Sequence, residues 1–318
     1  PMLIRRKNVL FFFLFITVLT GCQSSGRIEQ KDTQQRLIST APSITEILFD
    51  IGAGELVAGD SRFTVFPPEA AKIEKIGGLY DWNPEKILAL KPTQIFLLKE
   101  NETARSRFAE WGIRTVAVDH QSIEGVLQSY EIIGSTLGGS FRNTALEKQK
   151  KLRTKLNEFA DANRNRKKVR VLLCVDRSRN VGRIENLFVA GDSPMYNEIL
   201  ELAGGTNVAA KTGLPFPSIS PEGVLHMAPD VIIELFTGEG VSAAVLLSKE
   251  EQRRIVDGSR KDWQTLGNNV PAVKNDRIAV ILDDYATVPG PRLPLLAEQI
   301  ANICGNFRPC ENTAAAPN

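Results

Sequence analysis

Residues 83–98 have the sequence Asn-Pro-Glu-Lys-Ile-Leu-Ala-Leu-Lys-Pro-Thr-Gln-Ile-Phe-Leu-Leu, and residues 220–235 repeat its pattern as Ser-Pro-Glu-Gly-Val-Leu-His-Met-Ala-Pro-Asp-Val-Ile-Ile-Glu-Leu. The spacing between the two copies is constant, so that Glu85 matches Glu222 and Pro92 matches Pro229. In each copy a capping residue and a proline begin a short helix, and the second proline ends it. The apolar run that follows is typical of a buried parallel strand. A unit that occurs once in each half of the chain predicts two lobes of similar architecture.

The rest of the chain alternates between strand-like apolar runs and amphipathic helical stretches. Further strands are predicted at residues 36–40, 56–59 and 115–118 in the first half and at residues 169–175, 186–190 and 278–282 in the second. This alternation predicts an α/β fold in which helices cover parallel sheets.

A long helix is predicted between the two halves. Residues 141–162 contain no glycine or proline, and Leu152, Leu156 and Phe159 lie on one face of a helix drawn through them. We interpret this helix as a connector between the lobes; the alternative is an ordinary surface helix.

The first 21 residues have the features of an export signal. Arg5, Arg6 and Lys7 precede an apolar run at residues 9–19 that is too short to span a membrane. The run ends in Leu-Thr-Gly-Cys22, which resembles the lipobox of bacterial lipoproteins, in which the cysteine is lipidated. An ordinary secretory leader with a chance cysteine is the alternative. We therefore expect an exported lipoprotein, anchored in a membrane and facing the periplasm or the cell exterior, with residues 22–35 as a polar tether.

Composition and charge argue against some classes of function. The 318 residues, 42% of them hydrophobic, suffice for two lobes with their own cores. Without the three cations of the leader the formal charge falls from +2 to −1, and the only later basic run is at residues 164–168. A nucleic-acid partner is therefore not expected. His120 and His226 have no neighbours at metal-ligand spacing, which argues against a zinc or manganese site.

The remaining cysteines leave one question open. Cys174 lies in an apolar run, which favours a buried thiol. Cys304 and Cys310 bracket a short segment, and in an oxidising compartment a disulfide between them is plausible but not required. We expect residues 308–318 to form a disordered tail.

Several motifs together resemble a known family. Residues 36–48, 66–70, 76–78 and 83–92 look like the first lobe of the substrate-binding proteins of bacterial ABC importers for vitamin B12, ferric siderophores and haem. Residues 202–207, the second copy of the repeat and residues 290–293 continue the match in collinear order. The resemblance implies two Rossmann-like lobes, at residues 36–140 and 167–307, joined by one long helix at residues 141–166.

The resemblance also implies partners. In this family the ligand is held between the lobes and delivered to a permease dimer with its ATPase subunits, and the protein is not an enzyme and needs no cofactor. The glutamate in the first turn of each repeat pairs with permease arginines, which assigns that role to Glu85 and Glu222. Two carboxylates on rigid helix starts suit a dimeric partner. The alternative is that each carboxylate only stabilises its helix dipole.

The expected ligand is a small-molecule metal chelate, a corrinoid in the first place. Ligands of open α/β sheets bind at the carboxyl ends of the strands. The residues expected there are Phe63, Phe66, Tyr80, Trp82, Phe188, Phe216, Asp284 and Tyr285. Aromatic faces suit a large amphipathic ring, and a carboxylate can accept from its amides. Leu79 and Leu98 depart from the vitamin B12-binding branch, which tends to have tryptophan there. For each aromatic, core packing is the alternative, and we assign Trp111 and Trp263 to packing.

Two hypotheses about an anionic or iron-containing ligand remain open. Arg177, Arg179 and Arg183 crowd one predicted loop and are either solvated or meet an anionic ligand, such as a ferric siderophore or haem. Haem would also need an iron ligand, for which Tyr80, Tyr196 and Tyr285 are candidates.

An enzyme is the rival class of function. Residues 238–243, Gly-Glu-Gly-Val-Ser-Ala, fit a short dinucleotide-binding pattern. A glycine turn between a strand and a helix explains the same residues, and no Ser/His/Asp or Cys/His set is in a plausible context.

Overall fold

The computed structural model describes residues 35–179, 181–236 and 247–306. The leader, Cys22, Cys310, the glycine pattern at residues 238–243 and the tail from residue 308 lie outside the described residues, so the predictions made for them are not tested here.

The first lobe is built on a five-stranded sheet in which every pairing is parallel. Its strand order is β3-β2-β1-β4-β5. The strands are β1 (Leu37–Ser39), β2 (Val57–Asp60), β3 (Glu74–Lys75), β4 (Gln94–Leu98) and β5 (Arg114–Val118). The helices of this lobe are α1 (Pro42–Asp50), α2 (Pro84–Ala89), α3 (Arg105–Glu110) and α4 (Ile123–Leu137), with short 3₁₀ turns η1 (Gly54–Leu56), η2 (Pro68–Lys72) and η3 (Lys99–Ala104). The chain crosses outward from β1 to both edges, as in a Rossmann-like sheet.

The second lobe has a mixed sheet, which corrects the expectation of parallel strands throughout. Its order is β11-β10-β6-β7-β9, and β8 also pairs with β6. The strands are β6 (Val169–Arg177), β7 (Leu187–Val189), β8 (Gly205–Asn207), β9 (Ser218–Ile219), β10 (Val231–Leu235) and β11 (Ile278–Ile281). β7 runs antiparallel to β6 and to β9. The connection from β6 to β7, residues 178–186, is too short for the crossover that a parallel pair requires.

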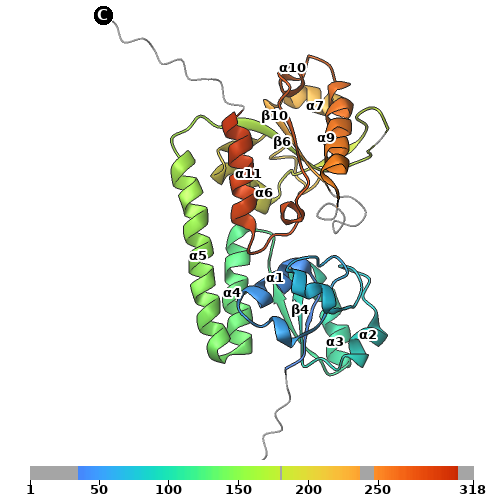
Figure 1. The fold of residues 1–318 in the computed structure, drawn as a ribbon, viewed down its shortest axis with the longest axis vertical. Helices are drawn as coiled ribbons and strands as arrows, with labels where there is room; N and C mark the ends of the chain where they lie inside the picture. The colour runs from blue at the N-terminus through green and yellow to red at the C-terminus, as the bar shows by residue number, and fades with distance from the viewer. Residues whose placement is uncertain (1–34, 180, 237–246, 307–318) are drawn as a thin grey trace, which may run out of the picture. The chain divides into compact units, whose positions relative to one another are not determined.

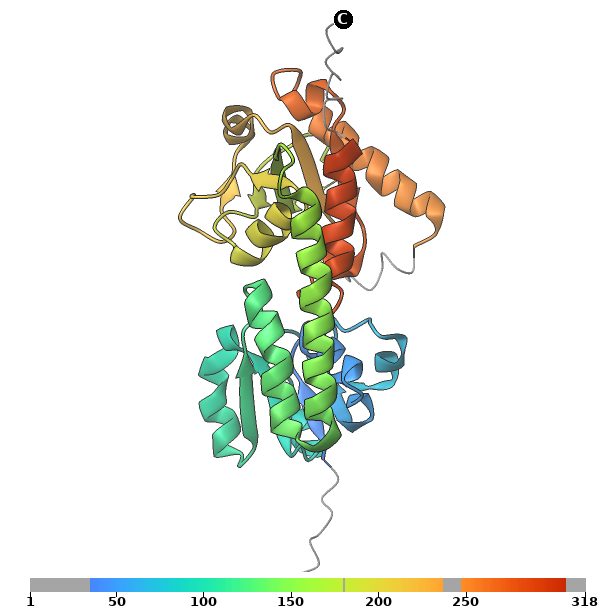
Figure 2. The same ribbon diagram turned by 90° about the vertical axis from the view of Figure 1, so that its left-hand side faces the viewer.

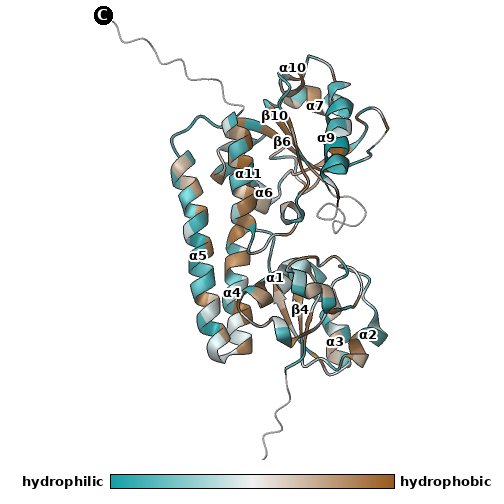
Figure 3. Cartoon of the chain, in the orientation of Figure 1, coloured by the Kyte–Doolittle hydropathy of each residue, from teal (hydrophilic) through white to brown (hydrophobic). Residues whose placement is uncertain are grey.

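Helices of the second lobe are α6 (Pro194–Leu202), α7 (Pro221–Met227), α9 (Lys249–Gln264), α10 (Pro271–Lys274) and α11 (Leu293–Asn306), with the 3₁₀ turn η4 (Asp284–Ala286). Figure 1 shows α7, α9 and α10 near β10, and α6 beside α11. Figure 3 shows the strands β4, β6 and β10 as hydrophobic, as expected for strands covered on both faces.

The repeated unit adopts the predicted structure in both lobes. α2 leads into β4 in the first lobe, and α7 leads into β10 in the second. Each strand is central, since β4 lies between β1 and β5 and β10 lies between β6 and β11. The predicted caps are present: the side chain of Asn83 accepts a hydrogen bond from the Lys86 N–H at 3.0 Å, and that of Ser220 accepts from the Gly223 N–H at 3.3 Å.

The long helix α5 runs from Gly139 to Asn163. It begins two residues before the predicted start, because Gly138, at φ 72°, turns the chain sharply after α4. Leu152 and Leu156 are buried, as predicted, while the exposed remainder is mostly hydrophilic (Figure 3). α5 packs against α4 of the first lobe and against α6 and α11 of the second (Figure 2). The helix therefore contacts both lobes, as a connector must.

One cluster of buried side chains extends through both lobes. It includes Leu37 and Ile44 of the first lobe, Leu152 of α5, and Ile233 and Leu296 of the second lobe. Each lobe has a further cluster of its own. In the part of the chain that the structure describes, no helix is both long enough and apolar enough to cross a membrane.

Candidate functional site

A cavity of about 460 Å³ lies between the two lobes, within the size range of small-molecule sites. Its first wall is formed by Leu79 and Tyr80 before α2, Glu100 after β4, and His120 and Gln121 after β5. Its second wall comes from the start of α6, the loop before β9, and the segment from η4 to α11. The lining residues of the second wall are Ser193, Pro194, Met195, Tyr196, Pro215, Phe216, Tyr285, Ala286, Thr287, Pro289, Leu293 and Leu296. The lining is therefore largely apolar, with the Glu100 carboxylate and a few neutral polar groups.

His120 is the buried polar group of the first wall. Its Nδ1 lies 2.8 Å from the Ser43 hydroxyl oxygen, while its Nε2 is buried and has no hydrogen-bond partner among the described residues. Burial lowers the pKa of His120 to about 4, with only a small opposing effect of Asp119. The imidazole is thus neutral at physiological pH. The neighbouring Gln121 donates from Nε2 to Glu100 Oε1 at 3.0 Å.

Three aromatic residues shape the second wall. The Tyr196 hydroxyl donates to the Ala286 carbonyl oxygen at 3.0 Å, and the ring of Phe216 meets the Tyr196 ring edge-on, with 6.2 Å between centroids. The Tyr285 hydroxyl donates to Gln299 Oε1 at 3.0 Å. Burial raises the pKa of Tyr196 above its usual value and that of Tyr285 to about 12. Both phenols therefore stay protonated at neutral pH.

The structure brings together only part of the predicted ligand-binding set. Tyr80, Phe216 and Tyr285 line the interlobe cavity, and the rings of Tyr80 and Phe216 are exposed. Trp82 instead packs on Phe108, with 5.6 Å between ring centroids, and lines a separate cavity of about 590 Å³ in the first lobe. Phe188 is exposed on β7, outside the lining.

Two other predicted aromatics pack against arginines. The Arg62 guanidinium lies 4.9 Å from the Phe63 ring centroid, and the Arg292 guanidinium lies 4.3 Å from the Phe66 ring centroid. Neither Phe63 nor Phe66 is among the lining residues. Of the two tryptophans assigned to packing, Trp263 is fully buried, and Trp111 packs edge-on against Phe108.

Asp284 is not among the residues that line the cavity, and its expected role toward a ligand stays a prediction. It is 5% exposed, and its two oxygens accept from Arg292 at 2.8 and 2.6 Å. Arg292 also donates from Nε to Glu46 Oε2 of α1 at 3.0 Å. Burial raises the pKa of Glu46 to about 7, although Arg292 opposes the rise. No local pattern in the sequence indicates that Glu46 and Arg292 form an interlobe pair, although both lie in segments that carry the family resemblance.

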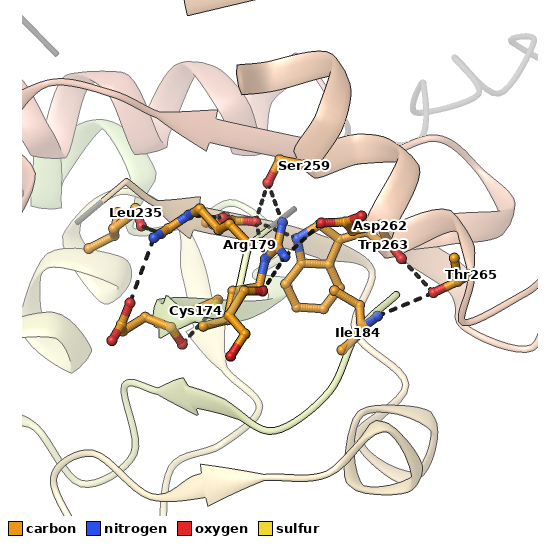
Figure 4. A network of polar contacts seen from close by, with 12 residues as sticks. Cys174, Arg179, Ile184, Leu235, Ser259, Asp262, Trp263 and Thr265 are labelled. Atoms are coloured by element: carbon orange, nitrogen blue, oxygen red, sulfur yellow. Dashed lines mark hydrogen bonds and ion pairs between the residues drawn. The ribbon is translucent and has the colours of Figure 1, made fainter. Parts of the chain in front are cut away.

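The arginines proposed for an anionic ligand are not among the lining residues either. Figure 4 shows the network of polar contacts in which Arg179 takes part instead. The Arg177 side chain is 2% exposed and binds Glu234 and Asp262 at 2.9 Å each. Arg179 donates to Glu234 and to the Leu235 carbonyl oxygen. The Glu234 carboxylate also accepts from Trp263 Nε1 at 2.7 Å.

Glu234 explains why this network is internal. It stands in the buried strand β10, where an uncompensated carboxylate would be very unfavourable, so the arginines turn inward to pair with it. Although burial raises the pKa of Glu234, Arg177 and the hydrogen bonds from Ser259 and Trp263 outweigh that effect and lower it. The third arginine, Arg183, is exposed and pairs with Glu185.

Glu85 and Glu222 occupy equivalent positions, one residue after the proline that begins α2 or α7, and both are exposed. Hydrogen bonds from its own backbone N–H and from the Ser220 hydroxyl lower the pKa of Glu222. Both side chains are therefore available at the surface.

The structure also locates Cys174, Cys304 and the described side chains of the types that ligate metals. Cys174 is buried, as predicted. Cys304 is buried in α11, and its pairing with Cys310 stays a prediction because Cys310 lies outside the described residues. Across residues 35–179, 181–236 and 247–306, no group of three or more His, Cys, Asp or Glu side chains could hold a metal ion.

The chain is similar to known proteins both in sequence and in structure. Residues 37–285 match the model of the periplasmic binding protein family. An uncharacterized ABC transporter substrate-binding lipoprotein of Bacillus subtilis, YvrC, is 28% identical over 285 residues, which cover 87% of this chain and 82% of the relative. The vitamin B12-binding protein of Salmonella typhimurium is 30% identical over 203 residues, covering 62% of this chain and 71% of the relative. The apo structure of the periplasmic heme-binding protein RhuT from Roseiflexus sp. RS-1 superposes with a TM-score of 0.70 at 24% identity, covering 86% of this chain and 99% of that one.

Proposed function

The chain belongs to the periplasmic binding protein family, whose members are transport components and not enzymes, and from that premise we propose that it is the substrate-binding component of an ABC importer. The observation that carries the proposal is the interlobe cavity, whose lining comes from both lobes. A ligand in this cavity contacts both lobes at once, so a partner protein that contacts both lobes can detect whether the ligand is bound.

The cargo that we propose is a corrinoid. The Salmonella relative carries the name of a vitamin B12-binding protein. Exposed faces of Tyr80 and Phe216 suit a large amphipathic ring, and neutral groups such as Gln121, Ser193 and Thr287 suit its amide side chains. A haem or ferric siderophore is the second candidate, because His120 and Tyr80 on the cavity wall are residue types that can ligate iron.

The surface that docks on the permease is assigned to Glu85 and Glu222. Each is exposed and is held at the start of a short helix in equivalent positions of the two lobes. Such a pair suits a permease dimer that presents the same basic pocket twice. ATPase subunits on the far side of that permease complete the importer.

Anchoring is assigned to Cys22, by lipidation after cleavage of the leader. The motif that supports this is Leu-Thr-Gly-Cys22 after a basic and apolar segment. The Cys22→Ser protein should accumulate unprocessed or be released from membranes, as measured by fractionation and mass spectrometry of the mature N-terminus. A wild-type mature chain without lipid would rule out this assignment.

The function is tested by titration and by transport. Purified protein should bind cyanocobalamin in calorimetry without turning it over, and the loaded protein should stimulate the ATPase activity of its cognate importer in lipid vesicles. Absence of binding to cyanocobalamin together with clear binding of an iron chelate would replace the corrinoid by the second candidate. Absence of binding to every chelate would refute the proposed function.

A further inference from the structure

We propose that the interlobe cavity selects for charge: it accepts metal chelates that are neutral or cationic and discriminates against chelates with net negative charge. This inference rests on the proposed function and narrows the class of cargo within it. It follows from where the structure puts the cations and carboxylates around the cavity.

Among the residues that the structure describes, no lysine or arginine lines the cavity. The charged residue of this lining is Glu100, and its polar groups are otherwise neutral amides, hydroxyls and the imidazole of His120. A carboxylate of a bound ligand would therefore find no cationic side chain on the described part of the walls.

His120 does not supply the missing charge. It is 3% exposed, and its Nδ1 is engaged with the Ser43 hydroxyl. Its depressed pKa leaves the imidazole neutral at physiological pH. The imidazole can therefore offer the cargo a neutral nitrogen but not a positive charge.

Arg292, close to the cavity, has its charge already neutralised. Its guanidinium lies 5.7 Å from the ring centroid of Tyr285, which lines the cavity. The same guanidinium binds two buried carboxylates, Glu46 and Asp284. A carboxylate from the ligand would compete with Asp284, whose two oxygens already hold this guanidinium, and would be repelled by it.

Several other cations in the loops of the two lobes also have carboxylate partners, some exposed and some buried. Arg62 binds Asp81 at 2.7 Å, and Lys99 lies 3.9 Å from Asp119. Arg177 and Arg179 bind Glu234. Lys211, on the loop that carries Phe216, is exposed and lies outside the lining.

The energetic consequence depends on the charge of the ligand. Moving an ionised carboxylate from water into a largely apolar cavity is costly unless a cation pairs with it. A chelate whose periphery carries amides or esters avoids that cost, because hydroxyls and amides can satisfy its hydrogen bonds. Glu100 adds repulsion for anions and attraction for cations.

The test compares haemin with its dimethyl ester, which share the ring and the iron and differ in two carboxylates. Affinities are measured by tryptophan fluorescence quenching at neutral pH in the same detergent, with cyanocobalamin as a neutral corrinoid. We expect the diester to bind at least tenfold more tightly than haemin. Equal or tighter binding of haemin would overturn the inference and leave the proposed function intact. If cyanocobalamin and both haems fail to bind while an anionic ferric siderophore binds, the inference is overturned and the proposed function stands; if no chelate binds, both fail.

Variants show whether the cavity walls cause the discrimination. Glu100→Gln combined with Gln121→Arg places a cation on the first wall and should reduce the preference for the diester at least tenfold. Gln128→Arg, on the exposed surface of α4 outside the lining, is the matched control and should leave the preference unchanged. Lys211→Gln should also have no effect. A loss of the preference in Gln128→Arg, or a gain in Lys211→Gln, would show that overall charge, and not the cavity, sets it.

Discussion

Arg292 and Glu46 lie 246 positions apart in the chain, yet the Arg292 Nε donates to Glu46 Oε2 at 3.0 Å and thereby joins the second lobe to α1 of the first. The same guanidinium holds Asp284. This three-residue ion cluster is buried between the lobes, and it leaves neither carboxylate without a cation.

Removing the cation of this cluster should be strongly destabilising. Arg292→Met leaves Glu46 and Asp284 buried without their partner, and breaking a buried ion pair in this way costs about 3–5 kcal/mol. Urea denaturation followed by circular dichroism measures the loss. Arg183→Met is the matched control, because Arg183 is exposed and pairs only at the surface, so its loss should stay below about 1 kcal/mol. Equal effects of the two substitutions would contradict this account.

Stability should depend on pH through Glu46. Its pKa is about 7 in the folded protein against an ordinary value of 4.5, so between these pH values the folded state binds more protons than the unfolded state. The free energy of unfolding should therefore fall as the pH rises from about 4.5 to about 7, by at most ~1.4 kcal/mol per pH unit from this group.

Urea denaturation across this range, compared between wild type and Glu46→Gln, checks the pH prediction. The variant should show a flatter profile. Burial also raises the pKa of Asp60 to about 7, so Asp60 contributes to the pH dependence of stability over the same range. The Asp60→Asn variant measures that contribution separately from the contribution of Glu46. A Glu46→Gln profile that parallels the wild type would show that Glu46 does not titrate in this window.

Phe216 should contribute to ligand affinity, whereas Phe188 should not. Both rings are about half exposed in the free protein, but only Phe216 lines the interlobe cavity. Covering the Phe216 ring with cargo should contribute about 1–3 kcal/mol, so Phe216→Ala should weaken binding roughly tenfold to a hundredfold. Calorimetry with cyanocobalamin measures both variants. A comparable loss in Phe188→Ala would place the ligand against β7 instead.

Glu85 and Glu222 should affect transport without affecting ligand affinity. Charge reversal to lysine should impair stimulation of the importer ATPase more than alanine does, because it adds repulsion from a basic pocket to the lost pairing. The double variant should be worse than either single one, since both lobes are held at once. Glu158→Lys, exposed on α5, is the control. If the Glu85→Lys, Glu222→Lys protein stimulates the ATPase fully, the two glutamates do not dock on the permease and only stabilise the starts of their helices.

Local patterns were sufficient to predict the helices and strands of the repeated unit and the long connecting helix, but not the antiparallel strand β7 of the second sheet. The repeated helix and strand, the caps at Asn83 and Ser220, and the long helix with Leu152 and Leu156 inward all depend on residues within a few turns of one another. Caps, proline positions and apolar periodicity act over such distances, so the sequence alone was enough to predict two α/β lobes and exposed first-turn glutamates.

The membership of the cavity was decided only by tertiary structure. Trp82 and Phe216 both precede a repeat and look equally suited to a ligand, but Trp82 finds Phe108 to pack on, while Phe216 is left at the cavity. Likewise, Arg177 turns inward because Glu234, 57 positions away, needs a cation in a buried strand. Which partner a side chain meets across such separations depends on how the sheets, helices and lobes pack, and that information is not contained in any local pattern.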